Sequence, residues 1–425
     1  MIRKYFKKLP SDLKKMVSFA GRVALLNKTR AYLVGGCVRD LILGAKNFDL
    51  DIVVENNGIK FAQRLADFME AKLTLHKKFA TATLKFNDHK VDIATARSEN
   101  YPAPASLPEI EPGSLKDDLA RRDFTINAMA INITGKDFAG FVDFFAGRKD
   151  LLHKKIRVMH NLSFIDDPTR ILRAIRFEQR LGFEIETNTL KCLKEAARKR
   201  MLEKVSKHRL RDELILMLKE DDPVKCLRRI QELADFRFIN KRIYLSGKNY
   251  RFLKSIKKEV NWFRKLFLYK RKIDSWLVYF TALVEVLSEK EVGDLCDDLA
   301  LPKSDKKRIL SYKSIDPVFI SRLKKKRNTP STIFRLLEPL SYEVILLLRA
   351  KFCDKIINKS TENFLTIYDD IRVITNGEDL RRLGLGPGPV YQKIFSRVLN
   401  AKVDGLIKSR AEELRLIKKI VNEFK

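Results

Sequence analysis

The sequence predicts an α+β protein in which a mixed α/β unit comes first and a long, nearly all-helical part follows. Short β-branched runs alternate with helical stretches from residue 30 to about residue 140. After residue 150 the strand signals fade and amphipathic helical patterns dominate. The 425 residues exceed what one hydrophobic core organises, so we expect two to four units of roughly 100–150 residues each.

The strands of the first unit are predicted from short apolar runs, which are YLVGG (32–36), LDIVVE (50–55), TATLKF (81–86), KVDIATA (90–96) and AMAINI (128–133). The stretch GIKFAQRLADFMEA (58–71) has its apolar residues at helical spacing. A Pro/Gly-rich stretch, YPAPASLPEIEPGS (101–114), predicts a long loop inside this unit, because strand-like and helical text resumes after it.

Amphipathic helices are predicted in the second part at PTRILRAIRFEQRL (168–181), NTLKCLKEAARKRM (188–201), SKHRLRDELILMLK (206–219) and DPVKCLRRIQEL (222–233). The amphipathic helical pattern is interrupted at LGLGPGPVYQ (383–392), after which a last pair of helices is predicted. Its GLGPGP turn, Gly384 to Pro389, is typical of turns that aim helix N–H groups at phosphates, and a plain helix–helix turn is the alternative.

The charge of the chain indicates a large anionic partner. Its 86 basic and 54 acidic side chains give a formal net charge of +32, far more than solubility requires, and nucleic acid is the leading candidate. Basic and aromatic residues interleave at 249–272, as in a surface that follows a nucleic-acid backbone. A membrane partner is not expected, because no run of about 18 apolar residues and no lipidation motif occurs.

Cysteine and histidine usage predicts a reduced, cytoplasmic protein without a structural zinc. The five cysteines lie far apart with no C-x-x-C pair, and the sequence opens without the apolar stretch of a signal peptide. The five histidines are scattered as well, and none precedes an aspartate. An appended phosphohydrolase activity is therefore not expected.

Two aspartates in F-D-L-D-I-V-V are the first candidate site. Residues two apart in a strand point to the same side, so Asp49 and Asp51 are expected to project together while Leu50 and Ile52 face the core. Burying both carboxylates without a counter-ion would cost several kcal/mol. Oxygen-only ligands suit Mg²⁺, which shares its shell with waters and substrate phosphates. The alternative is a solvent-facing D-x-D at the mouth of a strand.

A glycine pair upstream of these aspartates predicts a phosphate site. Gly35 and Gly36 follow a strand-like run, where glycine lets the backbone approach a ligand and the N–H groups of a starting helix hold phosphate oxygens. Arg39, one turn into that helix, can reach the same phosphates. Asp92, on a later strand, is either a third carboxylate of the site or a surface residue of an edge strand.

Two further motifs carry arginine beside aspartate. Arg121, Arg122 and Asp123 precede an apolar element; the arginines can contact a triphosphate while the aspartate caps N–H groups or orients an arginine. Such a run is also common on solvated helix ends. In FIDDPTRILRAIRFEQRLGF (164–183), Pro168 suits a first helical turn, and the helix after it carries a ridge formed by Arg170, Arg173 and Arg176.

An aspartate and an arginine on one rigid helix can bracket the edge of a base. Adenine and cytosine present an exocyclic amino donor beside a ring-nitrogen acceptor, which carboxylate and guanidinium match, whereas guanine and uracil present the reverse order. Such a protein template accepts ATP and CTP and refuses GTP and UTP. A solvated basic helix is the alternative for this arginine ridge.

G-G-x-V-R-D with D-x-D, then R-R-D-F-T-I-N-A, then D-D-P-x-R-I-L-R-A-x-R-F together resemble the class II tRNA nucleotidyltransferases, the CCA-adding enzymes and their close kin. The resemblance implies a polymerase-β-like nucleotidyltransferase head with a mixed sheet (1–145), followed by an all-α neck (146–220), body (221–350) and tail (351–425). The helical parts are implied to grip the acceptor and TΨC arms of tRNA.

The resemblance also implies the roles of the site residues. Gly36 and Arg39 would hold nucleotide phosphates, Asp49 and Asp51 two Mg²⁺ ions, and Arg121 or Arg122 the triphosphate. Asp167 and Arg170 would read the base, supported by Arg173 and Arg176. The implied reaction is two-metal phosphoryl transfer from ATP or CTP, in which one ion activates the tRNA 3′-hydroxyl and pyrophosphate leaves in line.

Two departures from the family pattern affect these expectations. Asp166 stands where the family often has glutamate, which changes how the start of the base-reading helix is held. Val142 to Gly147 replaces the family's D-P-x-x-G, so the hinge between head and neck is expected to work differently.

A bacterial poly(A) polymerase, which shares the three motifs, is the near alternative. Lys77-Lys78-Phe79-Ala80-Thr81 lacks the glycine of the basic patch usual in those enzymes. A nucleic-acid-binding protein with an inactive transferase head is the alternative from another class. The sequence leaves open whether CCA, CC or only the last A is added, and it leaves the oligomeric state open.

Overall fold

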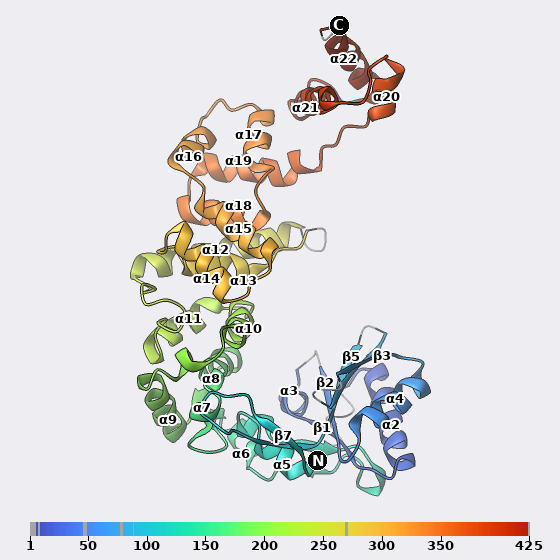
Figure 1. Ribbon diagram of the computed structural model, residues 1–425, viewed down its shortest axis with the longest axis vertical. Coiled ribbons are helices and arrows are strands. Elements are labelled where there is room, and N and C mark those ends of the chain that lie inside the picture. Colours follow the sequence, from blue (N-terminus) through green and yellow to red (C-terminus); the bar gives the residue numbers. More distant parts are fainter. Residues whose placement is uncertain are drawn as a thin grey trace. The chain divides into compact units, whose positions relative to one another are not determined.

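The computed structural model describes residues 6, 9–45, 49–76, 80–87, 89–267 and 271–423. The described chain forms two compact units, and Figure 1 labels their elements. The first unit runs to Met217 and takes in Lys225–Phe238, whereas the second consists of Leu218–Val224 and the chain from Ile239 onward. The chain therefore passes between the two units three times.

A seven-stranded sheet organises the first unit, in the order β3-β4-β5-β2-β1-β8-β9. β2 and β5 are parallel and the other neighbours are antiparallel, as expected of a mixed sheet. The strands are β1 (Ala31–Val34), β2 (Leu50–Val54), β3 (Lys72–His76), β4 (Thr81–Phe86), β5 (His89–Thr95), β8 (Ala130–Asn132) and β9 (Phe141–Val142).

All five predicted strand runs are confirmed, and two strands of the sheet were not predicted. β3 has no fully buried position, and its residues alternate between exposed and half-buried, so it carries only a weak apolar signal. β9 contains two residues, which is too short for a periodic pattern. Both strands lie at the ends of the sheet, where one neighbour suffices to hold them.

The helices of the first unit include all four predicted amphipathic stretches. They are α2 (Ser11–Leu26), α3 (Gly36–Leu43), α4 (Gly58–Met69), α5 (Leu115–Ala120), α6 (Gly147–Leu152), α7 (Ser163–Asp166), α8 (Thr169–Leu181), α9 (Thr187–Arg198), α10 (Lys207–Leu218) and α11 (Pro223–Leu233), with the 3-10 helices η2 (Thr125–Asn127), η3 (Gly135–Asp137) and η4 (Met201–Lys204). The two-residue strands β10 (Lys155–Ile156) and β11 (Glu184–Ile185) pair in parallel beside α8.

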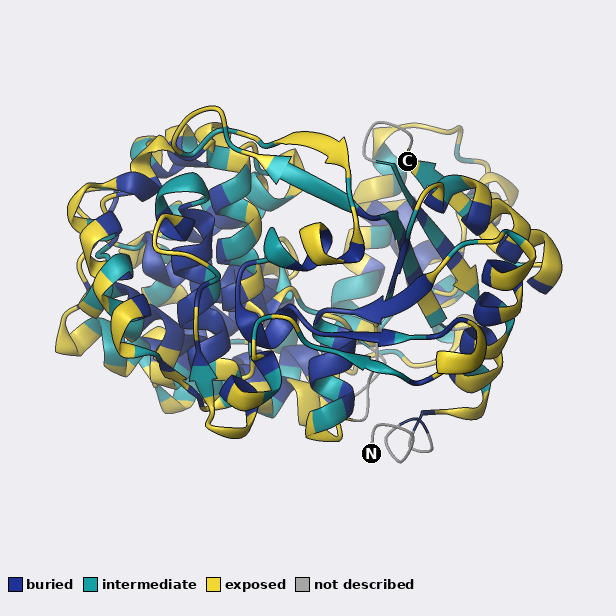
Figure 2. Cartoon of the chain, turned by 90° about the horizontal axis from the view of Figure 1, so that it is seen from below, coloured by how far each residue is buried: buried dark blue, intermediate teal, exposed yellow. Residues whose placement is uncertain are grey.

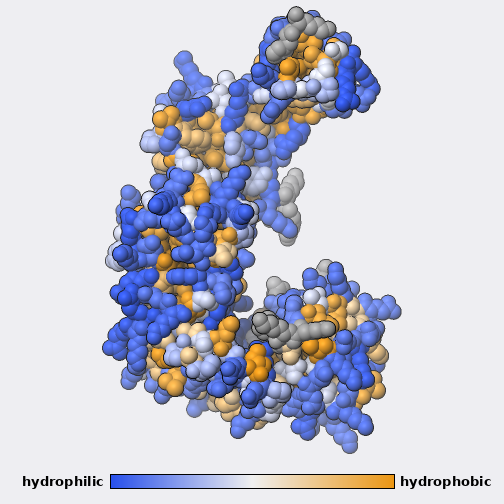
Figure 3. All heavy atoms as spheres, viewed as in Figure 1, coloured by the Kyte–Doolittle hydropathy of each residue, from blue (hydrophilic) through white to orange (hydrophobic). Residues whose placement is uncertain are grey.

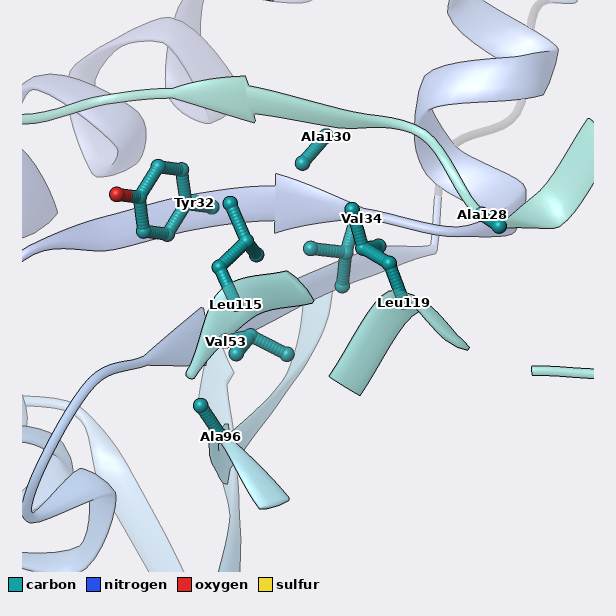
Figure 4. Packing of buried hydrophobic residues seen from close by; sticks show 8 residues of the cluster. All are labelled: Tyr32, Val34, Val53, Ala96, Leu115, Leu119, Ala128 and Ala130. Atoms are coloured by element: carbon teal, nitrogen blue, oxygen red, sulfur yellow. The ribbon is translucent and has the colours of Figure 1, made fainter. Parts of the chain in front are cut away.

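Helix α5 covers part of one face of the sheet. Its buried Leu115 and Leu119 pack against a cluster that includes Tyr32, Val34 and Val53, as Figure 4 shows. Burial of leucine side chains of this size stabilises the fold by about 1.5–3 kcal/mol each. The packing fixes the segment that follows α5, which carries Arg121, Arg122 and Asp123.

The Pro/Gly-rich stretch (101–114) was predicted to form one long loop. This prediction was wrong, because the stretch contains one strand of a hairpin. β6 (Arg97–Asn100) pairs with β7 (Glu109–Pro112), and the connection between them docks on α7 through Ala105 N, which donates to Ile165 O at 3.1 Å. Figure 2, coloured by burial, shows such exposed and half-buried strands in yellow and teal. The hairpin lacks the apolar alternation on which strand prediction depends.

The segment that departs from D-P-x-x-G forms the N-terminal cap of α6. Asp143 accepts hydrogen bonds from the backbone N–H groups of Gly147 (2.8 Å) and Arg148 (2.9 Å). Ala146 adopts the left-handed conformation at φ 57°, and a Cβ on Gly147 would lie 2.1 Å from Thr125 O. Gly147 therefore lets α6 pack closely on η2.

An ion pair closes the first unit over a long sequence separation. Arg229 on α11 donates to both carboxylate oxygens of Glu178 on α8, at 2.8 and 3.0 Å. Glu178 is buried, and a two-point guanidinium–carboxylate pair is strong in such surroundings. This ion pair thus connects the segment Lys225–Phe238 to the C-terminal turn of α8.

The second unit is helical throughout its described part. Its helices are α12 (Gly247–Phe267), α13 (Ser275–Leu283), α14 (Glu289–Asp298), α15 (Lys303–Lys313), α16 (Pro317–Leu323), α17 (Pro330–Leu337), α18 (Tyr342–Phe352), α19 (Lys355–Thr366), α20 (Gly377–Arg382), α21 (Pro389–Val403) and α22 (Arg410–Asn422), with η5 (Tyr368–Asp370). No described helix combines the length and the apolar character needed to cross a bilayer.

The last three helices share a hydrophobic cluster of their own, built on Leu380, Ile394, Val398, Ile417, Ile420 and Val421. The predicted last helical pair is confirmed as α21 and α22. The GLGPGP turn follows the end of α20 and leads into α21 at Pro389, and Gly384 in it has a φ of 82°, which favours glycine. Its predicted role toward phosphates stays a prediction.

Candidate active site

A cavity of about 540 Å³ in the first unit gathers most of the residues singled out from the sequence. Eleven of the thirteen predicted site residues line it, namely Gly36, Arg39, Asp49, Asp51, Arg121, Arg122, Asp123, Asp167, Arg170, Arg173 and Arg176. A neighbouring cavity of about 350 Å³ is lined by Asp92 and shares Asp51, Arg121 and Arg122 with the first. Three sequence motifs that are far apart in the chain therefore meet at one place.

The paired aspartates lie at the start of β2. Asp51 belongs to the strand, whereas Asp49 stands directly before Leu50, where the strand begins, and is exposed. Burial raises the pKa of Asp51 to about 6; Arg122 opposes the rise, and the nearby Asp92 and Asp49 add to it. The ionised form of Asp51 is thus incompletely compensated by the basic groups around it, and a divalent cation would supply the missing counter-charge.

Asp92 lies in the interior of the sheet and not on an edge strand. β5 runs between β4 and β2, and Asp92 is the direct neighbour of Asp51 in the parallel pairing. Its carboxylate accepts hydrogen bonds from Thr83 Oγ1 (2.7 Å) and Lys90 Nζ (2.6 Å). Among the described residues no three acidic, histidine or cysteine side chains are grouped closely enough to hold a metal ion by themselves.

The carboxylates fit a hard cation that takes only part of its shell from protein. Asp49 and Asp51 provide oxygen ligands, and the remaining positions would fall to water and phosphate, as Mg²⁺ prefers. The carboxylate of Asp51, which lies beside Asp92 and near Asp49 and has its pKa raised by burial, favours a cation there. Whether Asp92 joins as a ligand stays a prediction.

The glycine turn is shaped by an arginine from another motif. Gly35 has a φ of 72°, and a Cβ there would lie 2.4 Å from Arg122 Nη1. Gly36 then begins α3 and lines the cavity, so the N–H groups of the first turn of α3 lie at the cavity. Gly35 needs to be glycine, for its conformation and for the close approach of the guanidinium.

Arg39 is buried and held from two sides. It donates to both oxygens of Asp40, at 2.8 and 3.0 Å, and to Asn127 Oδ1 at 2.6 Å. Its guanidinium also lies 5.1 Å from the ring centre of Phe177. Asn127 and Phe177 were part of the quoted motifs, but no role for them was predicted.

One buried carboxylate orients both arginines of the R-R-D motif. Asp118 accepts from Arg121 Nη2 at 2.6 Å and from Arg122 Nη2 at 2.9 Å, and its side chain is 0% exposed. Arg121 also donates to Glu99 at 3.0 Å. The alternative of a solvated helix end is thus excluded, because neighbouring carboxylates fix these guanidiniums.

Asp123 orients an arginine, which is one of the two alternatives predicted for it, and it also binds one backbone N–H. Its Oδ1 accepts from the backbone N–H of Phe124 at 2.8 Å, and its Oδ2 accepts from Arg173 at 2.9 and 2.7 Å. The guanidinium of Arg173 helps keep the pKa of the buried Asp123 below its usual value, against the effect of burial. Arg173 also donates to Glu213 at 2.9 Å, and Arg176 lies 3.5 Å from the same carboxylate.

The base-reading pair of the prediction stands at the start of α8. Asp167 Oδ1 accepts from Thr169 N (3.1 Å) and Thr169 Oγ1 (2.6 Å), so it caps the helix, and it also accepts from Arg209 Nη2 (2.7 Å). Asp166 ends α7, and its Oδ2 lies 3.8 Å from His160 Nε2.

Arg170 is buried and spans the cavity wall. It donates to Ser163 Oγ at 2.6 Å and to the carbonyl of Arg121 at 2.9 Å, and its Nη2 lies 3.5 Å from the hydroxyl of Tyr101. Helix α8 is therefore bonded directly to the segment that carries the R-R-D arginines.

The residues that the sequence did not reveal are mostly the partners of those it did. They are Asp118, Glu99, Tyr101, Asn127, Phe177, Arg209 and Glu213. Only Asn127 and Phe177 stood inside quoted motifs. Lys77, Lys78 and Phe79, used above against a poly(A) polymerase, lie outside the described residues.

The cavity has carboxylates at the mouth of a sheet and a wall of oriented guanidiniums. This is the arrangement that holds a nucleoside triphosphate with its metal ion, and it is typical of nucleotidyltransferases.

The comparisons with known proteins agree with this class. The family model of the poly(A) polymerase head domain matches residues 31–157, and that of a probable RNA- and SrmB-binding site of polymerase A matches residues 182–243. An A-adding tRNA nucleotidyltransferase of Geobacter sulfurreducens is 37% identical over 414 residues, which are 96% of this chain and 47% of the relative. The chain thus spans about half the length of this curated relative.

Solved structures match over almost their full length. The structure of a CCA-adding enzyme, apo form II, is 33% identical with a TM-score of 0.76 and covers 99% of this chain and 98% of its own. A Thermotoga maritima CCA-adding enzyme complexed with tRNA is 31% identical with a TM-score of 0.72, and the match covers 99% of this chain and 98% of that one. The chain belongs to the family of class II tRNA nucleotidyltransferases, the CCA-adding enzymes and their close kin.

Proposed function

We propose that this chain is a template-independent tRNA nucleotidyltransferase that adds all or part of the 3′-terminal CCA from CTP, ATP or both. The observation that carries the proposal is the single cavity in which Asp49 and Asp51, the oriented arginines and the Asp167/Arg170 pair meet. Relatives named for A addition and for CCA addition, and a relative complexed with tRNA, support the same reaction.

In this proposal Asp49 and Asp51 together hold two Mg²⁺ ions. When bound, the metal would offset the charge of the triphosphate and favour the ionised 3′-hydroxyl of the tRNA. Asp92, beside Asp51, is the proposed third carboxylate.

The arginines and glycines take the triphosphate. Gly35 makes room for the guanidinium of Arg122, Gly36 lines the cavity at the start of α3, and Arg39 completes that end of the phosphate site. Arg121 and Arg122, fixed by Asp118, are preorganised donors, so little reorganisation is needed when negative charge develops on the leaving pyrophosphate.

Asp167 and Arg170 read the base. The carboxylate accepts from the exocyclic amino group and the guanidinium donates to the ring nitrogen, an order that adenine and cytosine match. Asp123 holds Arg173, and Arg173 and Arg176 support the nucleotide from the next turns of α8.

For the helical remainder we propose binding of the acceptor and TΨC arms of tRNA in the cytoplasm. The net charge of +32 supports a polyanionic partner, and Figure 3 shows a surface dominated by hydrophilic residues. The division into head (1–145), neck (146–220), body (221–350) and tail (351–425) is part of the proposal.

The test uses tRNA transcripts that lack all of CCA, its last two nucleotides or only its last one, each with one nucleotide at a time. A CCA-adding enzyme extends all three in order, whereas an A-adding enzyme extends only the last and only with ATP. Asp51→Ala, which should abolish incorporation while leaving tRNA binding largely intact, is the control. Absence of incorporation by the unaltered chain would contradict the proposal, and tails longer than three adenosines would favour a poly(A) polymerase.

A further inference from the structure

Helix α10 contributes none of the described residues that line the cavity, yet two of its side chains bind residues that do. Arg209 Nη2 donates to Asp167 Oδ1 at 2.7 Å, and Glu213 Oε1 accepts from Arg173 Nη1 at 2.9 Å. The two residues are four apart and so share one face of the helix. α10 thus sets a cation against Asp167 and an anion against Arg173.

The two carboxylate oxygens of Asp167 differ in their contacts with the protein. Oδ1 accepts three hydrogen bonds, two from Thr169 and one from Arg209. Among the described residues, no hydrogen bond reaches Oδ2. The side chains of Arg209 and Asp167 are 19% and 16% exposed, so their charge-assisted bond is largely shielded from water.

We propose that Arg209 is a positioning residue for nucleotide choice. By holding Oδ1, it fixes the plane of the Asp167 carboxylate so that Oδ2 is the acceptor presented to the exocyclic amino group of the base. The inference rests on the proposed function, which assigns base reading to Asp167 and Arg170. Arg209 itself does not line the cavity, so it acts on the nucleotide through Asp167.

Loss of Arg209 should therefore affect some nucleotides and spare others. Thr169 still binds Oδ1, but the carboxylate loses its counter-charge and its third anchor and can rotate away from the base. ATP and CTP carry the amino donor and should lose efficiency. Purine riboside triphosphate keeps the ring acceptor of adenine and lacks the amino group, so it gains little from Asp167 in the first place.

The experiment compares Arg209→Gln with the unaltered full-length chain, using ATP and purine riboside triphosphate on a tRNA acceptor that the chain extends. For Arg209→Gln, kcat/KM with ATP should fall about tenfold, the size of one hydrogen bond to a charged group, while that with purine riboside triphosphate stays within about twofold. Arg211→Gln is the matched control, because Arg211 lies on the same helix and binds Asp212 beside it. Arg209→Lys, which keeps one charged donor, should lose less than the glutamine variant.

An equal loss of kcat/KM with both nucleotides would mean that Arg209 only supports the fold, and it would overturn the proposal. Unchanged kcat/KM values with both nucleotides would also overturn it. Equilibrium binding of the two nucleotides without tRNA separates this outcome from a failure of the proposed function. If the unaltered chain incorporates nothing, the function is wrong, and a preference for binding ATP that Arg209→Gln abolishes still supports the role of Arg209. Equal binding of both nucleotides by the unaltered chain overturns it.

Discussion

Asp118 shows how single residues make the site. It is one of the most deeply buried charged groups of the first unit, and its two oxygens are divided between Arg121 and Arg122. The carboxylate is favourable in this position because both guanidiniums compensate its charge, and it orders them in turn, together with Glu99 at Arg121. The arrangement is a preorganised anion site in which each charge depends on the others.

Replacing Asp118 by asparagine should weaken both stability and nucleotide binding. The change removes the carboxylate that Arg121 and Arg122 share and leaves Arg121 with Glu99 alone. The free energy of unfolding of the first unit should therefore fall by about 3 kcal/mol, and KM for ATP should rise about tenfold. Urea unfolding and steady-state kinetics measure the two effects. Asp117→Asn, at the exposed capping position next to it, should cost only about 1 kcal/mol and leave KM unchanged. Similar effects in the two variants would contradict this role.

Asp51 predicts a pH dependence of the metal requirement. Burial raises its pKa to about 6, so below this pH the folded protein carries a proton that a cation must displace. The Mg²⁺ concentration for half-maximal incorporation should therefore rise about tenfold between pH 7 and pH 5. Metal titrations at pH 7, 6 and 5 check this, and a requirement independent of pH would refute it. Direct binding of Mn²⁺ should follow the same trend.

Among the elements, the junction of α6 and η2 matters most, because it links a structural turn to the site. η2 carries Asn127, which holds Arg39, and α6 packs directly against it. Gly147 permits this contact by having no Cβ, whereas its neighbour Ala146 sits in a conformation that glycine would adopt more easily.

The two neighbours should therefore respond to substitution with opposite signs. Gly147→Ala places a Cβ against the carbonyl of Thr125 and should destabilise the first unit by about 1–3 kcal/mol. Ala146→Gly relieves the left-handed backbone strain and should stabilise it by about 0.5–1 kcal/mol. Thermal unfolding of both variants measures the difference. The assignment of the close packing would be wrong if Gly147→Ala were neutral.

At the scale of the whole molecule, charge is the dominant property. The formal net charge is +32, and hydrophilic residues dominate the face of the molecule that Figure 3 shows. A polyanion releases counter-ions when it binds such a surface, so the affinity depends steeply on salt. A single nucleotide, held by a few fixed groups, depends on salt much less.

The affinity for tRNA should fall at least about 100-fold between 50 and 200 mM salt, whereas that for ATP should change less than about tenfold. Fluorescence anisotropy with labelled tRNA and equilibrium dialysis with ATP give the two slopes. Equal slopes would argue against an extended phosphate-binding surface. The comparison needs no catalytic turnover, so it is independent of the incorporation assays.

The sequence predicted most elements and most residues that face the cavity, because both leave local patterns. Short β-branched, apolar runs indicated the central strands, and most of the motif residues from Gly36 to Arg176 line the cavity as a group. What it did not reveal are groups whose importance comes from long-range contacts. Glu99, Arg209 and Glu213 look like ordinary surface charges in the sequence, and only the fold brings them to Arg121, Asp167 and Arg173.

The threefold passage of the chain between the units has a consequence for synthesis. Glu178 is made with α8, but its partner Arg229 follows 51 residues later, after the chain has visited the second unit. At ribosomal rates this delay is about 3–10 seconds. Until Arg229 has been made, Glu178 lacks this ion pair, and the first unit becomes complete only after Phe238 has left the ribosome.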